Sequence, residues 1–379
     1  MKSSFRHLGP FSDLVAAASR HDKLFPLAKP GKKTQQLVHR ALAFDPWPAT
    51  PRDVKLGRRW TRDGVDGEEI SWSVGFGPRT KAWLLRPASR TGKLPGVVAL
   101  HDHGAFKFYG KEKVADGPDP MTEVIRRYRA GYGGRAFANE LARRGFAVLV
   151  HDTFLWGSRK FPVETLPDFD RLLGRLMARG SVFYKWTPRK IAEYNGAAIV
   201  NEHTLARYCL VMGISQPGII NFDDRVAVNV LASRRDVDAG NLGCVGFSGG
   251  GFRAVLLQAT CPRIRVSVAG GCMCTYEEMF DHCVDNHAWL GFLPAWAQHG
   301  EWPDVAACRA PSPLMVVNCW ADGGCTVPGI KAAHRRIAAH YKSVGKPENY
   351  KGAFYTGQHR FDIPMQDAAF EWMERRLKR

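Results

Sequence analysis

The segment that decides the fold is Leu242-Gly-Cys-Val-Gly-Phe-Ser-Gly-Gly-Gly-Phe-Arg-Ala-Val-Leu-Leu257. It starts with a mostly apolar run, typical of a strand that is buried on both faces. The run leads into Gly246-Phe247-Ser248-Gly249-Gly250, and the apolar residues from Phe252 onward have the spacing of a helix. The glycines allow a sharp, strained turn between strand and helix, so we expect Ser248 to stand at its tip.

Four further apolar runs have the same character and end in polar or glycine-containing segments. They occupy residues 97–100, 146–150, 266–269 and 314–317. Continuous apolar runs are typical of parallel strands that helices cover on both sides. Two more polar segments, 70–74 and 81–85, predict an antiparallel pair at an edge of the sheet.

Helical patterns lie between these strands, and apolar residues repeat with helical spacing in 137–142, 226–231, 330–341 and 370–377. The alternation predicts an α/β fold with a mostly parallel, doubly wound sheet. Two insertions, at about 154–217 and 272–313, follow strands, so we expect helical segments that form a cap over the ligand-binding edge. We assign residues 1–60 to an N-terminal helical and loop segment and residues 61–379 to the main domain.

The composition is that of an ordinary folded protein and excludes several classes. Of 379 residues, 45% are hydrophobic and 24% are charged, which excludes collagen, coiled coils and wholesale disorder. No apolar run approaches the roughly 18 residues of a membrane span. The apolar stretch 14–18 is too short for a secretory signal. We therefore expect a cytoplasmic protein without a membrane partner.

The net charge of +18 is the compositional outlier, but the basic residues are dispersed along the chain. A solvated basic surface produces such a charge, so we expect no nucleic-acid partner, with salt-dependent binding as the test. The nine cysteines are an odd number, and only Cys272 and Cys274 lie close together. This spacing predicts reduced, buried thiols rather than disulfides or a zinc site. The sequence leaves monomer and homo-oligomer open.

A serine hydroxyl is a weak nucleophile at neutral pH, so Ser248 needs a base, and the base needs an orienting acid. After an elbow of this kind, the acid and then the histidine follow on later loops. Asp322 comes just after the strand 314–317, and His359 follows a short strand-like segment before the last helix. We predict that these three side chains meet. Other acids and histidines that could fill the two roles are Glu277, Glu278, His334 and His340.

These features resemble the α/β-hydrolases of the dienelactone hydrolase and acetyl xylan esterase-like group. The likeness runs from about Gly96 to the C-terminus. It is carried by Leu100-His-Asp-His-Gly104, Gly133-Gly-Arg-Ala-Phe137, Asp152-Thr-Phe-Leu-Trp-Gly157, Val237-Asp-Ala-Gly-Asn-Leu-Gly-Cys-Val-Gly-Phe-Ser-Gly-Gly-Gly251, Asp322 and His359. The resemblance implies an eight-stranded sheet, a triad of Ser248, Asp322 and His359, and no cofactor.

Two backbone amides are predicted to stabilise the oxyanion of an acyl-transfer reaction. The amide of Gly249 follows the nucleophile at the start of a helix, so it points to where negative charge develops. The resemblance implies His103 as the second donor, with Gly104 beside it. Relatives usually read His-Gly-x in this loop, whereas Asp102 replaces the glycine here. A carboxylate at this place is unfavourable near an oxyanion unless it points away.

The segment from Trp289 to Trp302 is rich in aromatic residues, and we predict that Trp289 and His287 contact the substrate. The alternative is a cap that packs on the sheet. Pocket walls are mostly apolar, so the two roles are compatible.

A metal site is a competing interpretation of the segment after residue 100. His101 and His103 lie two residues apart on a strand, so both imidazoles would face the same side. Further ligands that could join them are His151, Asp152 and His203. Since the triad accounts for more of the sequence, we predict no metal.

The sequence therefore predicts a serine hydrolase that cleaves the carboxylic ester of a small or medium substrate through an acyl-enzyme on Ser248. The same triad supports hydrolysis of a carbon–carbon bond next to a ketone, or of a thioester or amide. The alternative from another class is a catalytically silent binding protein that keeps the fold. Fold alone does not select among these functions.

Overall fold

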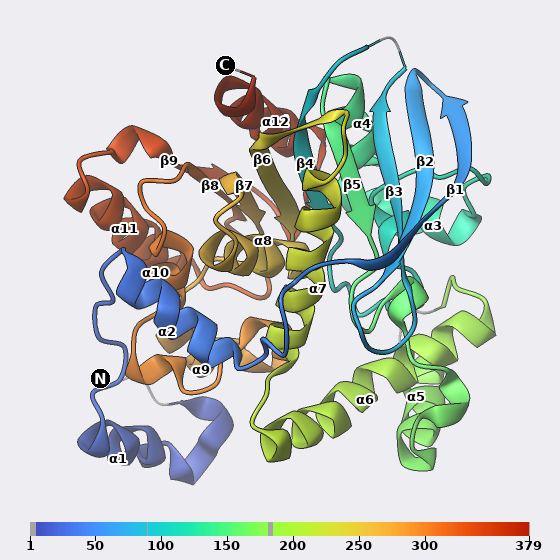
Figure 1. Cartoon of the computed structure of the whole chain (residues 1–379). Helices are drawn as coiled ribbons and strands as arrows, with labels where there is room; N and C mark the ends of the chain where they lie inside the picture. The colour runs from blue at the N-terminus through green and yellow to red at the C-terminus, as the bar shows by residue number, and fades with distance from the viewer. Residues whose placement is uncertain (1–4, 89, 181–184, 379) are drawn as a thin grey trace.

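A nine-stranded sheet runs through the middle of the protein in the computed structural model, which describes residues 5–88, 90–180 and 185–378 (Figure 1). In sheet order the strands are β1 (Arg52–Arg62), β2 (Val65–Ser73), β3 (Thr80–Pro87), β5 (Ala147–His151), β4 (Leu94–Leu100), β6 (Val237–Phe247), β7 (Ile264–Gly270), β8 (Leu314–Cys319) and β9 (Tyr350–Tyr355). The strands from β5 to β9 in this order are parallel, and β1, β2 and β3 join them by antiparallel pairing. The prediction of a mostly parallel α/β sheet is confirmed.

The sheet has one strand more than the eight expected, because β1 extends its antiparallel edge beyond β2. Nearly every residue of β1 is exposed, including Val54 and Leu56. An edge strand of this kind has no buried face, so its sequence lacks the apolar run that marked the other strands.

Helices cover both faces of the sheet (Figure 1). They are α1 (Asp13–His21), α2 (Lys32–Leu42), α3 (Glu123–Tyr128), α4 (Phe137–Arg143), α5 (Asp168–Gly180), α6 (Arg189–Met212), α7 (Gln216–Ala232), α8 (Gly249–Thr260), α9 (Tyr276–His282), α10 (Trp302–Ala307), α11 (Val327–Ser343) and α12 (Ile363–Leu377). The helices that the sequence predicted near residues 137, 226, 330 and 370 are α4, α7, α11 and α12.

Two hydrophobic cores lie on opposite faces of the sheet. Along β4, Val98 and Leu100 join the core beneath α7 and α8, whereas Val97 and Ala99 join the core beneath α4 and α12. This alternation follows from the two-residue period of a strand. It explains why the strands read as continuous apolar runs: both of their faces are buried.

The insertions follow β5 and β7. The first contains α5 and α6, which lie side by side at the lower right of Figure 1. Their backbones approach closely, since a Cβ on Gly174 would lie 2.3 Å from the amide nitrogen of Ala197. In the described part of the chain, no helix combines the length and the apolar character needed to cross a membrane.

Candidate active site

Ser248 occupies the turn between β6 and α8 with φ 57° and ψ −122°, a conformation that costs energy for a residue other than glycine. The surrounding glycines are required by close backbone packing. A Cβ on Gly246 would lie 2.2 Å from the carbonyl oxygen of Gly250, and one on Gly250 would lie 2.2 Å from that of Leu100. The predicted strand, sharp turn and helix are therefore present in the structure.

Asp322 and His359 meet on the loops that follow β8 and β9. The Nδ1–H of His359 donates a hydrogen bond to Oδ2 of Asp322 at 2.6 Å, and the amide of Gly324 donates to Oδ1 at 2.9 Å. The aspartate side chain is 3% exposed and the histidine side chain 39%. Because a proton on Nδ1 leaves Nε2 as an acceptor in the neutral ring, His359 can receive a proton on its second nitrogen.

Ser248 and His359 line the same cavity, which has a volume of about 420 Å³. Its other walls come from the loop after β4, from α6 and from residues 285–291. The structure thus pairs His359 with Asp322 and places His359 in the wall of the same cavity as Ser248. Of the other candidates, Glu278 accepts from Thr326, His334 contacts Tyr350 and His340 contacts Asp304. Glu277 is exposed in the first turn of α9 and does not line this cavity.

Trp289 and His287, the two residues predicted to contact a substrate, both line this cavity. The rest of the aromatic segment behaves differently. Trp296 and Trp302 are 0% exposed and belong to the hydrophobic core. The segment therefore has both of the roles considered from the sequence, substrate pocket and packed cap. Its first half forms part of the cavity wall, and its second half packs in the hydrophobic core.

Two backbone amides lie close together beside Ser248. Gly249 is the first residue of α8, and a Cβ on it would lie 2.4 Å from the amide nitrogen of His103. The first amides of a helix lack a partner within that helix, so they are available to an anion. The predicted pair of oxyanion donors, Gly249 and His103, is thus adjacent in the structure.

The side chain of His103 is fixed by two hydrogen bonds. Its Nδ1 accepts from the amide of Ala105 at 3.0 Å, and its Nε2–H donates to Oε1 of Glu202 at 2.9 Å. Its carbonyl oxygen accepts from Lys113 at 3.0 Å and from Trp156 at 3.2 Å. These contacts hold the loop from both sides, with the backbone of His103 packed against Gly249.

Glu202 is a residue of the cavity wall that the sequence analysis missed. Lys107 approaches its Oε1 to 2.5 Å, and both side chains are buried. Burial by itself raises the pKa of Glu202, but the Lys107 ammonium and the His103 imidazole outweigh burial and lower that pKa to about 2. The wall therefore carries a paired negative charge at neutral pH.

The carboxylate of Asp102 is held by two tyrosines of the segment that follows the loop. Oδ1 accepts from the hydroxyl of Tyr132 at 2.7 Å, and Oδ2 accepts from the hydroxyl of Tyr128. The ammonium of Lys113 lies 3.9 Å from Oδ2, and burial lowers the pKa of that lysine to about 8. Asp102 does not line the cavity, so its charge is engaged away from the predicted oxyanion donors.

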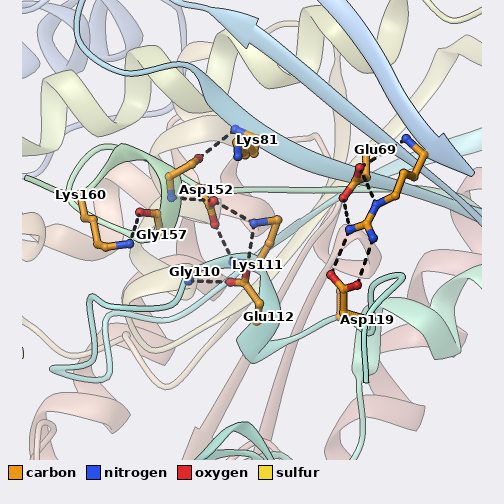
Figure 2. Close-up of polar contacts among 12 residues, drawn as sticks. Glu69, Lys81, Gly110, Lys111, Glu112, Asp119, Asp152, Gly157 and Lys160 are labelled. Atoms are coloured by element: carbon orange, nitrogen blue, oxygen red, sulfur yellow. Dashed lines mark hydrogen bonds and ion pairs between the residues drawn. The ribbon is translucent and has the colours of Figure 1, made fainter. Parts of the chain in front are cut away.

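A buried ion pair ties the end of the same loop to the segment after β5 (Figure 2). Asp152 accepts from the Lys111 ammonium at 3.0 Å and from the Lys111 amide at 2.9 Å. The ammonium also bonds to Glu112 at 2.8 Å, and the two carboxylates raise the pKa of Lys111 despite its burial. The pair fixes the segment that carries Lys107 and Lys113, which in turn hold Glu202 and His103.

The residues considered for a metal site are spread over separate contacts. His101 donates from Nδ1 to the Asp102 carbonyl, and His151 contacts Asp224 at 2.8 Å. Nδ1 of His203 accepts from Trp289. Across residues 5–88, 90–180 and 185–378, no three His, Cys, Asp or Glu side chains are placed to share a metal ion.

A mostly parallel sheet with a serine elbow after β6 and polar residues after β8 and β9 is the α/β-hydrolase fold. No family model matches the chain. The curated protein "Putative hydrolase YtaP" of Bacillus subtilis (strain 168) is 21% identical over 280 residues, which are 72% of this chain and 75% of that protein.

Solved structures that share the fold at low sequence identity include two that are named as esterases. The first, from Bacteroides fragilis NCTC 9343, is titled "putative acetyl xylan esterase"; its TM-score is 0.63 at 16% identity, over 92% of this chain and 82% of that chain. The second is "Methylesterase BT1017", with a TM-score of 0.57 at 18% identity over 90% of this chain. The chain spans only 62% of that methylesterase.

Proposed function

We propose that this protein is a serine hydrolase that cleaves carboxylic esters of small or medium size. The observation that carries the proposal is the His359–Asp322 hydrogen bond of 2.6 Å beside a cavity that Ser248 also lines. The two solved structures described above are named as ester hydrolases, which supports the same reaction class. The cavity of about 420 Å³ is within the range of small-molecule sites.

In the proposed reaction, Nε2 of His359 takes the Ser248 proton as Oγ attacks the ester carbonyl carbon. The amides of Gly249 and His103 donate hydrogen bonds to the oxyanion that forms. His359 then gives the proton to the departing alcohol, which leaves an acyl-enzyme on Ser248. A water molecule, deprotonated by His359, attacks this ester, and His359 returns the proton to Oγ of Ser248 as the carboxylic acid departs. Asp322 stabilises the imidazolium that forms in each half of the reaction.

The test is labelling with a fluorophosphonate together with turnover of p-nitrophenyl acetate. We expect the wild type to be labelled and to hydrolyse the ester, and Ser248→Ala to lose both properties. Circular dichroism of the variant controls for folding. Labelling of the wild type without turnover of any ester would redirect the proposal to carbon–carbon bond cleavage. Absence of labelling would overturn the activated serine and favour a binding protein.

A further inference from the structure

A second cavity, of about 580 Å³, adjoins the cavity that contains Ser248. Two residues, His203 and Trp289, line both of them. The indole Nε1–H of Trp289 donates to Nδ1 of His203 at 3.1 Å, so this pair forms the partition between the two spaces. Trp289 is 40% exposed, and His203 is also exposed. The partition is therefore a surface contact with few packing constraints.

The walls of the second cavity are mainly apolar. They come from the end of α6, the turn before α7 and the segment after Trp289, and include Ala206, Cys209, Leu210, Ile214, Phe292 and Leu293. Leu210 is 80% exposed although it lines the cavity. Exposed apolar surface in a concave site is typical of a place where an apolar ligand group binds.

The cavity around Ser248 has a different chemistry. Glu202 carries a paired charge in its wall, and four histidines line it beside apolar residues such as Ile199, Phe252 and Leu290. Its polar share is larger than that of the second cavity, and it suits the ester group and polar neighbours of that group. A chain attached to an ester at Ser248 would bury apolar surface by passing the Trp289–His203 pair into the second cavity.

We propose that the second cavity is a subsite for the apolar chain of an ester whose carbonyl lies at Ser248. The inference rests on the proposed esterase function and specifies its substrate class: esters with an alkyl or aryl group of several carbons on one side of the ester bond. The shared wall of Trp289 and His203 places the second cavity next to the one that Ser248 lines, and this position favours a substrate chain as the occupant.

The first experiment compares kcat/KM in two series of esters. Acyl chains are varied as p-nitrophenyl acetate, butyrate and octanoate; alcohol groups are varied as ethyl, butyl and octyl acetate. Burial of each methylene corresponds to about a fourfold gain. We expect kcat/KM to rise in one series, and that series identifies which side of the ester enters the subsite. A flat or falling profile in both series overturns the subsite.

The neighbouring residues Leu210 and Val211 give a matched pair of variants. Both are exposed, at 80% and 87%, but only Leu210 is part of the cavity wall. Leu210→Asp places a charge in the wall, so we expect the ratio of kcat/KM for the longest to the shortest ester to fall at least tenfold. Val211→Asp is expected to keep the wild-type ratio. Equal effects of the two variants would contradict the proposal.

A binding measurement separates failure of the subsite from failure of the esterase function. Titration calorimetry of Ser248→Ala with octanoate and with 1-octanol measures binding without turnover. We expect at least one of the two compounds to bind, and we expect the double variant Ser248→Ala, Leu210→Asp to lose that binding. If p-nitrophenyl acetate is hydrolysed but neither compound binds, the subsite is wrong and the function stands. If the wild type is inactive but binding depends on Leu210, the esterase function is wrong and the second cavity is an apolar ligand site without a role in ester cleavage.

Discussion

Asp322 is the residue whose replacement tests the proposed mechanism most directly, because both of its carboxylate oxygens have partners, the ring of His359 and the amide of Gly324. Asp322→Asn keeps the shape but removes the charge that stabilises an imidazolium and the acceptor that fixes the tautomer. We expect kcat for p-nitrophenyl acetate to fall by about 10⁴. Steady-state kinetics measure this loss, with the melting temperature as a control for folding. A loss below tenfold would remove Asp322 from the mechanism.

Glu202 gives a pH-dependent prediction. Its pKa is lowered from 4.5 to about 2, so the carboxylate stabilises the fold above pH 4.5, and this stabilisation is lost as the pH falls toward 2. We expect Glu202→Gln to lower the free energy of unfolding at pH 7 by on the order of 3 kcal/mol, because Lys107 then stays buried without its partner.

Urea unfolding at pH 7 and at successively lower pH values measures the Glu202 effect. The difference between wild type and Glu202→Gln is expected to shrink below pH 4.5. Glu193→Gln on the same helix is the control, since Glu193 pairs with the exposed Arg189 and is expected to contribute less than about 0.5 kcal/mol. A difference that is independent of pH would show that the ion pair with Lys107 does not stabilise the fold.

At the residue scale, the sequence predicted the grouping of Ser248, Asp322 and His359 because each follows a recognisable strand. It did not predict Glu202, which contacts His103 across 99 positions of the chain. Nor did the sequence predict the partners of Asp102, because the direction of its carboxylate depends on where Tyr128 and Tyr132 pack. A side chain's partners depend on the packing of distant segments, for which a single sequence has no periodic signal.

At the scale of elements, the close packing in the turn between β6 and α8 predicts that replacing Gly246 destabilises the protein. A Cβ on Gly246 would meet the backbone of Gly250 at 2.2 Å, and backbone atoms cannot move aside as a flexible side chain can. We expect Gly246→Ala to lower the free energy of unfolding by about 1–3 kcal/mol. It should also impair activity, because the turn positions Ser248.

Gly131→Ala is the matched control for the turn, since a Cβ there would meet no atom within 4 Å. Urea unfolding of both variants measures the difference, and the control is expected to stay within about 0.5 kcal/mol of the wild type. If both variants have wild-type stability, the close packing between β6 and α8 is not as the structure describes.

Elements with a buried face were predictable, and elements without one were not. The strands β4 to β8 read as apolar runs because helices cover both of their faces. β1 is exposed along its length and gives no such signal. The insertion at about 154–217 contains α5 and α6, in line with the expected helical segments, yet Leu172 and Leu176 of α5 are exposed rather than packed.

At the scale of the whole molecule, a prediction concerns the reactivity of the cysteines. All nine are free and buried in the described part of the chain, as the sequence predicted. The cooperative core protects them, so we expect Ellman's reagent to react slowly with the native protein and to titrate nine thiols after unfolding in guanidinium chloride. Fewer than nine reactive thiols after unfolding would indicate a disulfide. Several thiols that react rapidly in the native protein would indicate that the core is accessible to the reagent.

The sequence by itself determined the alternation of the buried strands with helices, the strained turn at Ser248 and the placing of Asp322 and His359 on later loops. These features are encoded locally, in apolar periodicity and in glycines at a turn. Only the tertiary structure decided that Glu202 and Lys107 support the His103 loop, that Asp102 faces two tyrosines, and that Trp289 and His203 divide two cavities. Those arrangements depend on packing between segments far apart in the chain, and such packing leaves no local pattern.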